Sequence, residues 1–415
     1  MKTPLPTEKK PLQPMLSGVR VVDLAHMLAG GYGSMLLGDL GAEIIKIEPL
    51  EIGDRTRLLG PPFVEGESGY FLAINRNKRS VALDLKKEEG RQVLYDLVRV
   101  SDVVFDNFRP GVMEEMGCGY ETLKEINPRI IYCTLSGFGE TGPYRDRPAF
   151  DLAIQAISGA MSITGEPGRP PVRMGVTMGD LGGSLFCAFA ISAALYAREK
   201  TGLGRKIDIA LMDCLVSLLT YVGQYYLLDG QVPGPMGSGH VSVVPYQAFP
   251  TKDIYIVVAV FVEKFWQALC RVLGAEELID DPRFADNGRR RDHREELIPI
   301  LEEIFRTRPG KEWLRLLAEA GVPSGPINTL DRVFADPQVA ARNMVVEIDH
   351  PKIGRFRSIG NPVKTPPMPE GPFASPPIHG QHTEEVLREV LGYSRDEIER
   401  LRERRVISCL SPPMV

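Results

Sequence analysis

Short apolar runs and longer segments with helical periodicity alternate along the first 230 residues of the chain. Runs that predict buried strands lie at 19–24, 42–48, 80–85, 103–105, 129–135 and 206–211. Segments that predict helices lie at 34–40, 88–100, 120–126, 151–163, 181–198 and 212–228. Strands that alternate with helices in this way predict an α/β fold with a mostly parallel sheet covered by helices on both faces.

Polar residues follow several of the predicted strands at their carboxyl ends. His26-Met27, Asn107-Phe108-Arg109 and Ser136-Gly137 all occupy such positions. Ligands of parallel sheets bind beyond the carboxyl ends of the strands, so we expect these residues to share one rim. The first turn contains Gly31-x-Gly33, but a dinucleotide fingerprint would need a third glycine where the chain has Leu36.

The pattern changes after about residue 230. A stretch rich in Gly, Pro and Ser at 231–244 predicts a linker. Two apolar runs, 245–249 and 254–260, predict strands of a smaller α+β domain, and amphipathic helices are expected at 263–273, 294–307 and 310–320. The Pro- and Gly-containing segment 322–327 is expected to turn the chain back.

Composition and charge exclude several classes of function. The net charge of −5 leaves no basic excess for nucleic acid as a partner. The apolar stretch 184–197 is short of a membrane span, and no apolar signal region begins the sequence, so a cytoplasmic protein without a membrane partner is expected. The six cysteines form no Cys-x-x-Cys pair, which predicts buried, reduced thiols.

Common catalytic motifs are absent from the sequence. The close histidine pair His379-x-x-His382 lies beside Gly380 in a predicted loop, with no cysteine or carboxylate pattern to complete a metal site. The Gly-x-Ser-x-Gly elbow of serine hydrolases and the Gly-Lys-Ser/Thr ending of phosphate loops are both missing. We expect no metal and no tightly bound cofactor, and oxidoreductase chemistry has the least support.

Residues 75–79 (Asn-Arg-Asn-Lys-Arg) form a cationic cluster just before a predicted strand, and Lys86-Lys87 follows that strand. Two interpretations of the cluster are open. It is either a solvated turn or a binding site for a phosphate-bearing cofactor, because Arg and Lys bind phosphate oxygens well.

Asp180 stands between Gly179 and Gly182-Gly183, where a flexible loop meets a long apolar helix. Two interpretations are again open. Asp180 caps the helix, a role that aspartate commonly fills, or it is a sterically open nucleophile whose ionised form the helix N-terminus favours. Arg145, Arg147 and Arg173 flank the loops that lead to Asp180 and are candidates for binding an anionic acceptor.

Several motifs in the same order resemble the class III CoA-transferases, a family that includes formyl-CoA transferase, carnitine CoA-transferase and the alpha-methylacyl-CoA racemases. The resemblance runs nearly end to end, through residues 16–24, 40–48, 77–86, 106–111, 148–151, 179–180, 245–250 and 380–387. It implies a large Rossmann-like domain built from both ends of the chain and a smaller α+β domain, in an interlocked homodimer. The large domain is then expected at 1–230 and 336–415, and the small domain with its linkers at 231–335.

The resemblance also implies a mechanism and a set of CoA contacts. Asp180 would attack the acyl-CoA thioester, giving an aspartyl anhydride and then an aspartyl-CoA thioester, with backbone N–H groups of the nearby glycines stabilising the oxyanions. Acyl-CoA and a small carboxylic acid would be the substrates. Positions carried over as contacts to CoA or its acyl group are His26, Leu28, Ala29, Leu83, Asp84, Leu85, Lys86, Asn107, Phe108, Arg109 and Asp151.

Four departures from the family pattern refine the expected substrate and reaction. Leu28 replaces the glutamine of formyl-CoA transferase, which argues against formyl or oxalyl substrates, and Glu115 and Pro49 stand where some members bind CoA with basic residues. Phe150 replaces the histidine base of the racemases, which favours a transferase over a 2-methylacyl-CoA racemase or isomerase. A non-catalytic CoA-binding scaffold is a third hypothesis. The arginines near Asp180 suggest a dicarboxylate such as succinate.

Overall fold

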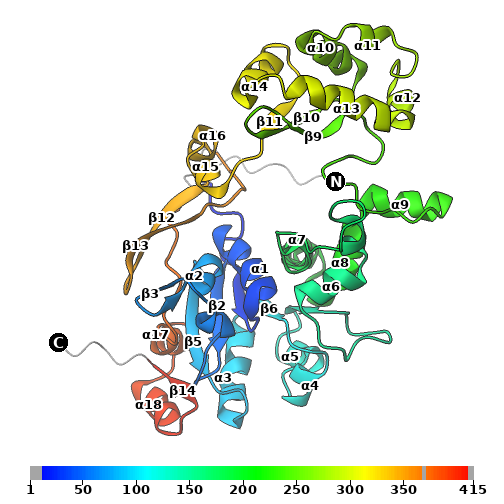
Figure 1. Ribbon diagram of the computed structural model, residues 1–415. Helices are drawn as coiled ribbons and strands as arrows, with labels where there is room; N and C mark the ends of the chain where they lie inside the picture. Colours follow the sequence, from blue (N-terminus) through cyan, green and yellow to red (C-terminus); the bar gives the residue numbers. More distant parts are fainter. Residues whose placement is uncertain (1–11, 367–370, 410–415) are drawn as a thin grey trace, which may run out of the picture. The chain divides into compact units, whose positions relative to one another are not determined.

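The computed structural model describes residues 12–366 and 371–409, which divide into two compact units (Figure 1). Met161–Arg173 and Leu228–Ala340 form unit two, and the other described residues form unit one. The sequence placed the domain boundaries after residues 230 and 335. The structural division falls after Leu227 and Ala340, and it assigns the additional segment Met161–Arg173 to unit two.

A seven-stranded sheet forms the centre of unit one, in the order β14-β5-β2-β1-β6-β7-β8. The strands are β1 (Arg20–Asp23), β2 (Glu43–Glu48), β5 (Lys78–Leu83), β6 (Val103–Asp106), β7 (Ile131–Ser136), β8 (Arg205–Ala210) and β14 (Ile407–Ser408). All pairings are parallel except that of β14, which runs antiparallel to β5. The prediction of an α/β fold with a mostly parallel sheet is therefore confirmed.

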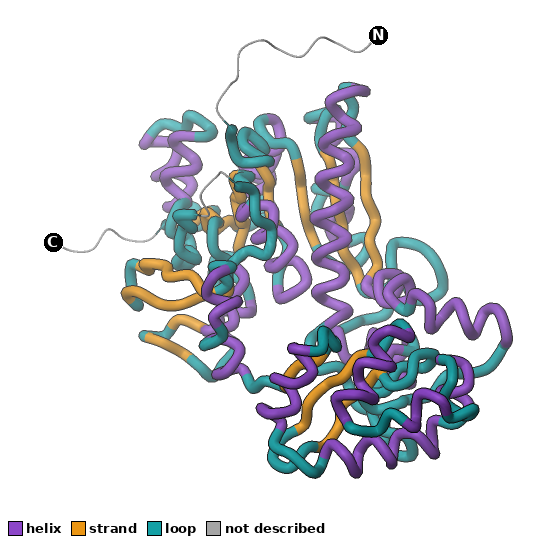
Figure 2. The backbone as a smooth tube through the Cα atoms, turned by 90° about the horizontal axis from the view of Figure 1, so that it is seen from above, coloured by secondary structure: helices purple, strands orange, loops and turns teal. Residues whose placement is uncertain are grey.

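Helices cover both faces of this sheet, as Figure 2 shows. One core contains residues of α1 (Met27–Asp39), α7 (Met178–Thr201) and α8 (Leu211–Leu218) packed on the strands. The opposite core contains residues of α3 (Glu88–Arg99), α5 (Tyr120–Ile126), α17 (Thr383–Glu389) and α18 (Arg395–Glu403). Burial on both faces explains why the strands appear in the sequence as continuous apolar runs.

Smaller elements complete unit one. They are the 3-10 turn η1 (Arg55–Leu58), β3 (Phe63–Val64), β4 (Glu67–Ser68), α2 (Gly69–Ile74), α4 (Val112–Glu115), α6 (Asp151–Ile157), and the hairpin of β12 (Val345–His350) and β13 (Gly354–Ile359). By length and composition alone, α7 could cross a membrane, but nearly half of its most apolar stretch is buried and its inward residues belong to the core.

The first helix begins earlier than predicted. The glycines before residue 34 were expected to form a loop, whereas α1 begins at Met27 and includes them. A Cβ on Gly30 would lie 2.3 Å from the Ala25 Cβ, and one on Gly31 would lie 2.8 Å from Ile74. The glycines are therefore needed for close packing of α1, which outweighs their low helix propensity.

The prediction of a single helix at 212–228 is also wrong. The structure has α8 followed by α9 (Thr220–Asp229), bent by 75° relative to each other. The bend coincides with Thr220, whose φ of 46° lies in the left-handed region that interrupts an α-helix. Similarly, the predicted helix 151–163 ends at Ile157, and a 3-10 turn η2 (Ala160–Ile163) follows Gly159 at φ 88°.

Unit two contains an antiparallel sheet of three strands, β9 (Tyr246–Pro250), β10 (Tyr255–Ala259) and β11 (Ser324–Pro326). Its helices are α10 (Glu263–Leu273), α11 (Glu277–Asp280), α12 (Asn287–Asp292), α13 (Arg294–Phe305), α14 (Gly310–Glu319) and α15 (Leu330–Phe334), and α16 (Pro337–Ala341) follows at its boundary. Trp266, Phe305 and Trp313 are central to its core, which is separate from the two cores of unit one.

Candidate active site

A cavity of about 510 Å³ lies at the carboxyl edge of the unit-one sheet. His26 after β1, Asn107 after β6 and Ser136 at the end of β7 all contribute to its wall. The structure thus brings together the three segments that the sequence placed on one rim. Asp180 from α7 and Phe150 from the residue before α6 line the same cavity.

Asp180 is the third residue of α7, and the N-cap of that helix is Thr177. The interpretation of Asp180 as the N-cap is therefore wrong. Asp151 supplies the missing cap from α6, because its Oδ1 accepts hydrogen bonds from the backbone N–H groups of Gly179 at 2.8 Å and Asp180 at 3.2 Å. A carboxylate from a neighbouring helix thus satisfies two N–H groups that the first turn of α7 leaves free.

Asp151 is buried and is itself held by Gln155, one turn further along α6. Gln155 Nε2 donates to Asp151 Oδ2 at 2.6 Å, and its Oε1 accepts the N–H of Met174 at 2.9 Å. Asp151 is not one of the residues that line the cavity. Its carboxylate lies against the backbone of α7, so the N–H groups of Gly179 and Asp180 are already engaged and are not free oxyanion donors.

The Asp180 carboxylate is destabilised in its ionised form. Burial, followed by the negative charge of Asp151, raises the pKa of Asp180 to about 7. No residue in the described parts of the chain donates a hydrogen bond to this side chain or pairs with it. Burial, with a contribution from the Asp180 charge, also raises the pKa of Tyr70 on α2, a residue that no sequence motif marked.

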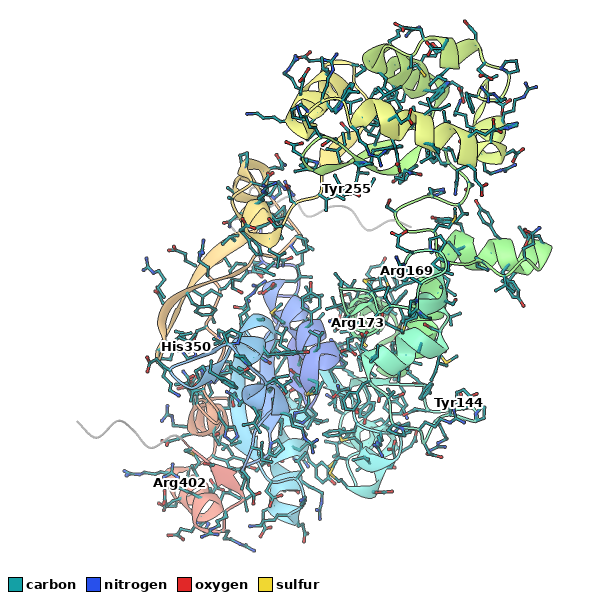
Figure 3. The ribbon with its side chains drawn as sticks, viewed as in Figure 1. Tyr144, Arg169, Arg173, Tyr255, His350 and Arg402 are labelled. Atoms are coloured by element: carbon teal, nitrogen blue, oxygen red, sulfur yellow. The ribbon has the colours of Figure 1, made fainter. Side chains whose placement is uncertain are left out.

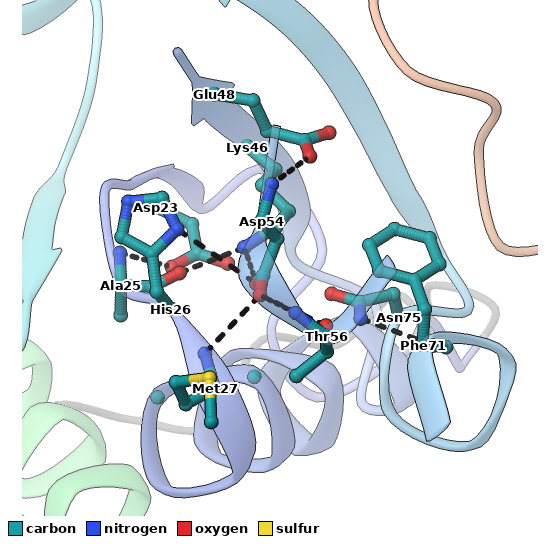
Figure 4. A network of polar contacts seen from close by, with 12 residues as sticks. Asp23, Ala25, His26, Met27, Lys46, Glu48, Asp54, Thr56, Phe71 and Asn75 are labelled. Carbon is teal, nitrogen blue, oxygen red and sulfur yellow. Dashed lines mark hydrogen bonds and ion pairs between the residues drawn. The ribbon is translucent and has the colours of Figure 1, made fainter. Parts of the chain in front are cut away.

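The loop that connects β1 to α1 is fixed on both sides by polar contacts (Figure 4). Asn107 brackets His26, accepting its N–H at 2.8 Å and donating to its carbonyl at 2.7 Å. Lys46 Nζ donates to the carbonyl of Ala25 at 2.7 Å. Met27, at the start of α1, has a φ of 61°, a conformation unusual for a residue with a side chain. These contacts hold a strained turn that presents His26 to the cavity.

A buried ion pair contacts the backbone of this loop (Figure 4). Lys46 Nζ lies 2.9 Å from Asp54 Oδ2, and both side chains are fully buried. Asp54 also accepts the N–H of Met27 at 3.3 Å through Oδ1. Burial opposes ionisation of both groups, but the Lys46 charge outweighs it and holds the pKa of Asp54 well below its usual range.

Glu48 extends the buried network at the end of β2. It accepts the N–H of Asp54 at 2.8 Å and pairs with Arg57 at 2.7 Å. Burial opposes its ionisation, but hydrogen bonding and charge from Arg57 lower its pKa to about 2. Burial, and then the Lys46 charge, lower the pKa of His26, which favours the neutral form of the imidazole that faces the cavity.

Four arginines give the cavity a cationic wall: Arg55, Arg109, Arg145 and Arg147. Arg109 was expected from the family pattern, and Arg145 and Arg147 from their position before Asp180. Arg55 was missed because it belongs to the short η1 turn, which has no recognisable sequence pattern. Arg173 belongs to unit two, so its predicted role near the acceptor remains a prediction.

Arg145 and Arg147 lie on the loop between β7 and α6. Arg145 contacts the neighbouring carboxylate of Asp146 at 3.4 Å, and both side chains are largely exposed. The Arg147 guanidinium stacks 3.8 Å above the ring of Tyr144, which Figure 3 labels on this loop. Neither contact buries the arginine, so both guanidinium groups can still bind a small anion.

The cationic cluster at 75–79 has neither of the two roles considered for it. Arg76, Lys78 and Arg79 pair with Asp39, Asp23 and Glu43, respectively. Arg76 and Lys78 are buried, and burial lowers the pKa of Lys78 to about 8. These cations neutralise carboxylates inside unit one, so they are neither a solvated turn nor a phosphate site. Their partners lie far away in sequence, and no local pattern could have identified them.

A second cavity of about 850 Å³ adjoins the first. The two share the wall residues His26, Pro49, Ile52 and Phe108. The second cavity is also lined by four of the predicted CoA contacts, Leu83, Asp84, Leu85 and Lys86. Of the remaining expected contacts, Ala29 lines the first cavity, whereas Leu28 lines neither.

The histidine pair considered for a metal site has other contacts. His379 Nε2 lies 2.9 Å from the carbonyl of Pro49, and His382 Nδ1 accepts the N–H of Ser80 at 3.2 Å. Both histidines therefore connect the C-terminal part of unit one to its sheet and its cavity-lining loop.

Comparison with known proteins places this geometry in context. A family model described as CoA-transferase family III matches residues 16–383. The human succinyl-CoA:glutarate CoA-transferase is 42% identical over 392 residues, which cover 94% of this chain and 90% of that protein. A succinate–glutarate CoA-transferase of Agrobacterium fabrum is 38% identical and covers 94% of this chain and 98% of its own length.

A solved structure is also similar over most of the chain. The crystal structure of a CAIB/BAIF family protein from Brucella suis superimposes with a TM-score of 0.81 at 40% sequence identity. The match covers 92% of this chain and all of that one. The mixed α/β fold is therefore shared with a protein of recognisable sequence similarity.

The electrostatic setting of Asp180 predicts its titration. In NMR of protein whose aspartates are labelled with carbon-13, we expect Asp180 to titrate near pH 7. This is about three pH units above the titration of an exposed aspartate. Asp151→Asn should lower that pKa, because the asparagine oxygen can still cap α7 but no longer carries a charge. Asp213→Asn, which removes an exposed carboxylate on α8, should leave it unchanged. An Asp180 that titrates near 4 in the unaltered protein would contradict this prediction.

Proposed function

The chain belongs to CoA-transferase family III, and we propose that it exchanges CoA between two small carboxylic acids through covalent intermediates on Asp180. The observation that carries this proposal is the placement of Asp180. Its carboxylate lies on the wall of a cationic cavity, with no hydrogen-bonding partner in the described parts of the chain. A structural carboxylate in such a place would normally be paired, so its open position suits a nucleophile.

In the first half-reaction, an oxygen of Asp180 attacks the carbonyl carbon of the donor acyl-CoA. The C–S bond breaks, and CoA leaves as a thiolate from a mixed anhydride of Asp180 and the donor acid. The thiolate then attacks the carboxyl carbon of Asp180, which releases the donor carboxylate and leaves an aspartyl-CoA thioester. Covalent catalysis of this kind divides one difficult acyl exchange into easier steps.

The second half-reaction reverses these steps with the acceptor. A carboxylate oxygen of the acceptor attacks the aspartyl carbonyl carbon and expels the CoA thiolate, giving a second mixed anhydride. The thiolate attacks the acceptor carbonyl carbon, and Asp180 leaves as a free carboxylate. No proton is gained or lost over the cycle, so the only titration it requires is ionisation of Asp180.

The surroundings of Asp180 favour its role as a nucleophile. Burial and the Asp151 charge make the carboxylate less stable when ionised, and a carboxylate of raised pKa is more nucleophilic once it has lost its proton. Asp151 also fixes the first turn of α7 and therefore the position of the attacking group. Arg109 and the other cavity arginines provide positive charge for anionic substrates and intermediates.

Phe150 favours transfer over racemisation. Its side chain is 74% exposed and lines the cavity that contains Asp180. A phenyl ring cannot remove a proton, so the position of the racemase base is occupied by an inert group. Proton exchange at the α-carbon of a substrate would therefore lack a base at this point.

We infer that the exchanged acids are dicarboxylates such as succinate and glutarate. Similar transferases bear those substrates in their names, and the cavity offers arginines beyond the single cation needed near the thioester. Arg145 and Arg147 are exposed to the cavity and held only by weak surface contacts. A guanidinium binds a second carboxylate in bidentate geometry, which distinguishes a dicarboxylate from a monocarboxylate.

We also propose the interlocked homodimer that the family resemblance implies. Helix α9 supports it, because none of its residues is buried although several are large and apolar. Exposed side chains on it include Tyr221, Tyr225, Tyr226 and Leu227. Large apolar side chains exposed together on one helix are typical of a protein interface.

Removal of the nucleophile tests the mechanism. Asp180→Ala is expected to lose CoA transfer at least about a thousandfold, because the covalent route is closed. In the unaltered protein, acyl-CoA plus hydroxylamine should convert Asp180 to a hydroxamate, detected by peptide mass spectrometry. Asp213→Asn, which changes an exposed carboxylate, should retain both activity and adduct. Full activity in Asp180→Ala, or an adduct on another residue only, would refute the mechanism.

The acid preference can be tested through the loop arginines. Arg145→Ala and Arg147→Ala should each raise the KM for succinyl-CoA by about tenfold or more, from the loss of a charge-assisted hydrogen bond. The KM for butyryl-CoA, which lacks the distal carboxylate, should change little. Arg99→Ala on α3, outside the cavity, provides the matched control. Equal effects on both thioesters would contradict a role in dicarboxylate recognition.

The assembly can be tested by light scattering coupled to size-exclusion chromatography. We expect the mass of two chains, and Leu227→Arg on α9 should shift the protein toward a monomer because a charge is costly in an apolar interface. Leu203→Arg, at an exposed apolar site before β8, serves as the control. A monomeric unaltered protein would rule out the proposed dimer.

A further inference from the structure

Gln155 is a fully buried amide on α6, the helix that packs against α7. It lines neither of the two cavities, so it is not placed to touch a substrate. Both ends of its side chain are nevertheless occupied. Nε2 donates to Asp151 Oδ2 at 2.6 Å, and Oε1 accepts the N–H of Met174 at 2.9 Å. These contacts connect Gln155 to the carboxylate that caps α7 beside Asp180.

The partners of Gln155 fix the orientation of its amide. The backbone N–H of Met174 can only donate, so it requires the amide oxygen. The amide nitrogen must then face Asp151, where an ionised carboxylate can only accept. Gln155 therefore cannot turn its amide over without opposing like groups at both ends.

Asp151 has few other groups to stabilise its charge. Its Oδ1 accepts the N–H groups of Gly179 and Asp180, and it forms no ion pair with any residue that the structure describes. Among the described side chains, only that of Gln155 donates to it. A buried carboxylate needs such donors, because burying a charge without them is costly. Loss of Gln155 would leave Oδ2 of Asp151 without a donor.

Met174 gives the Gln155 amide a fixed attachment. It is the residue at which the chain returns to unit one after the segment Met161–Arg173, shortly before α7 begins at Met178. Gln155 thus holds the approach to α7 directly and the first turn of α7 through Asp151. Two consecutive parts of the chain that carries Asp180 depend on one amide.

Few charged groups surround this chain of contacts. Burial and the Asp151 charge raise the pKa of Asp180, and Tyr70 on α2 is close enough for its pKa to be raised in part by both aspartates. Helix α8 also packs against α6, and its Asp213 is exposed. His26 and the four cavity arginines line the same cavity as Asp180.

We propose that Gln155 is a positioning residue for the transfer reaction, which holds the Asp151 carboxylate against the first turn of α7 and so fixes the charge and the backbone beside Asp180. This inference rests on the proposed function, in which Asp180 attacks the thioester. Gln155 acts through Asp151 and touches no reacting atom. Its loss should therefore change the titration and the reactivity of Asp180 without changing the binding of CoA.

Gln155→Met tests this role, because methionine has a similar length but no amide. In carbon-13 NMR, the pKa of Asp180 should fall, as in Asp151→Asn, because the neighbouring carboxylate loses its charge or moves away from α7. The acid limb of kcat/KM should move to lower pH with it. At pH 8, kcat should fall roughly tenfold or more from poorer placement of the attacking group, while KM stays within about twofold.

A paired exchange tests the direction of the hydrogen bonds. Asp151→Asn alone opposes two amide N–H groups, and Gln155→Glu alone opposes two carboxylates. In the double variant, the asparagine can cap α7 and donate to the new carboxylate, which accepts the N–H of Met174. We expect a thermal unfolding midpoint and a kcat closer to those of the unaltered protein than in either single variant. The charge then lies further from Asp180, which should still titrate at lower pH.

Gln92 on α3 provides the matched control. Its Nε2 donates to Asp96 Oδ1 at 3.0 Å, with the same spacing of four residues along a helix, but Gln92 is exposed and lies outside the cavity. Gln92→Met should leave the titration of Asp180, kcat and KM unchanged.

Each alternative result has a definite meaning. An unchanged titration of Asp180 in folded Gln155→Met would overturn the positioning role. A double variant that is no more stable and no more active than its single variants would overturn it too, and this comparison decides the case if Gln155→Met does not fold. If Asp180→Ala keeps full activity, the covalent mechanism fails, whereas the NMR titrations still decide whether Gln155 acts on Asp180.

Discussion

The buried pair of Lys46 and Asp54 is the contact on which the rest of the site depends. It is fully enclosed, and each partner also bonds the backbone of the turn between β1 and α1, through Ala25 and Met27. Removing either partner would leave an unpaired charge in a low-dielectric interior, a loss of about 3–5 kcal/mol in comparable cases. The pair therefore fixes a turn that is strained at Met27, and with it the position of His26 between both cavities.

Two carboxylates near the start of α7 lie in different surroundings. Asp151 is enclosed and bonded to backbone N–H groups, whereas Asp180 is open to the cavity and has a raised pKa. The helix N-terminus stabilises the first charge directly, and the first charge then disfavours the second. The Asp151 charge therefore opposes the stabilisation that the N-terminus of α7 would otherwise give to an ionised Asp180, so Asp180 ionises at a higher pH.

Much of the fold could be predicted because its strands are buried on both faces, and continuous apolar runs mark such strands. The start of α1 could not be predicted, because its glycines are needed for packing against Ala25 and Ile74 rather than for a turn. The break at Thr220 likewise depends on a backbone angle that no local pattern reveals.

Within the site, strand ends located the rim segments correctly, since the edge of a parallel sheet follows from topology. The capping role of Asp151 could not be predicted, because no pattern in the sequence shows that α6 packs against α7. Arg55 lies in a turn without periodicity, and the partners of Lys78 and Arg76 are set by tertiary contacts. Long-range pairing is therefore the information that sequence patterns lacked.

The division of unit one around unit two has a consequence for the order in which the protein matures. Contacts such as the hydrogen bond from Ala82 to Thr383 join residues 301 positions apart, and β14 completes the sheet only through residues 407 and 408. A chain emerging from the ribosome must therefore finish unit two before α17 and α18 can cover one face of the sheet. Until then only α3 and α5 cover that apolar face, which makes late synthesis the stage at which this protein most needs protection from aggregation.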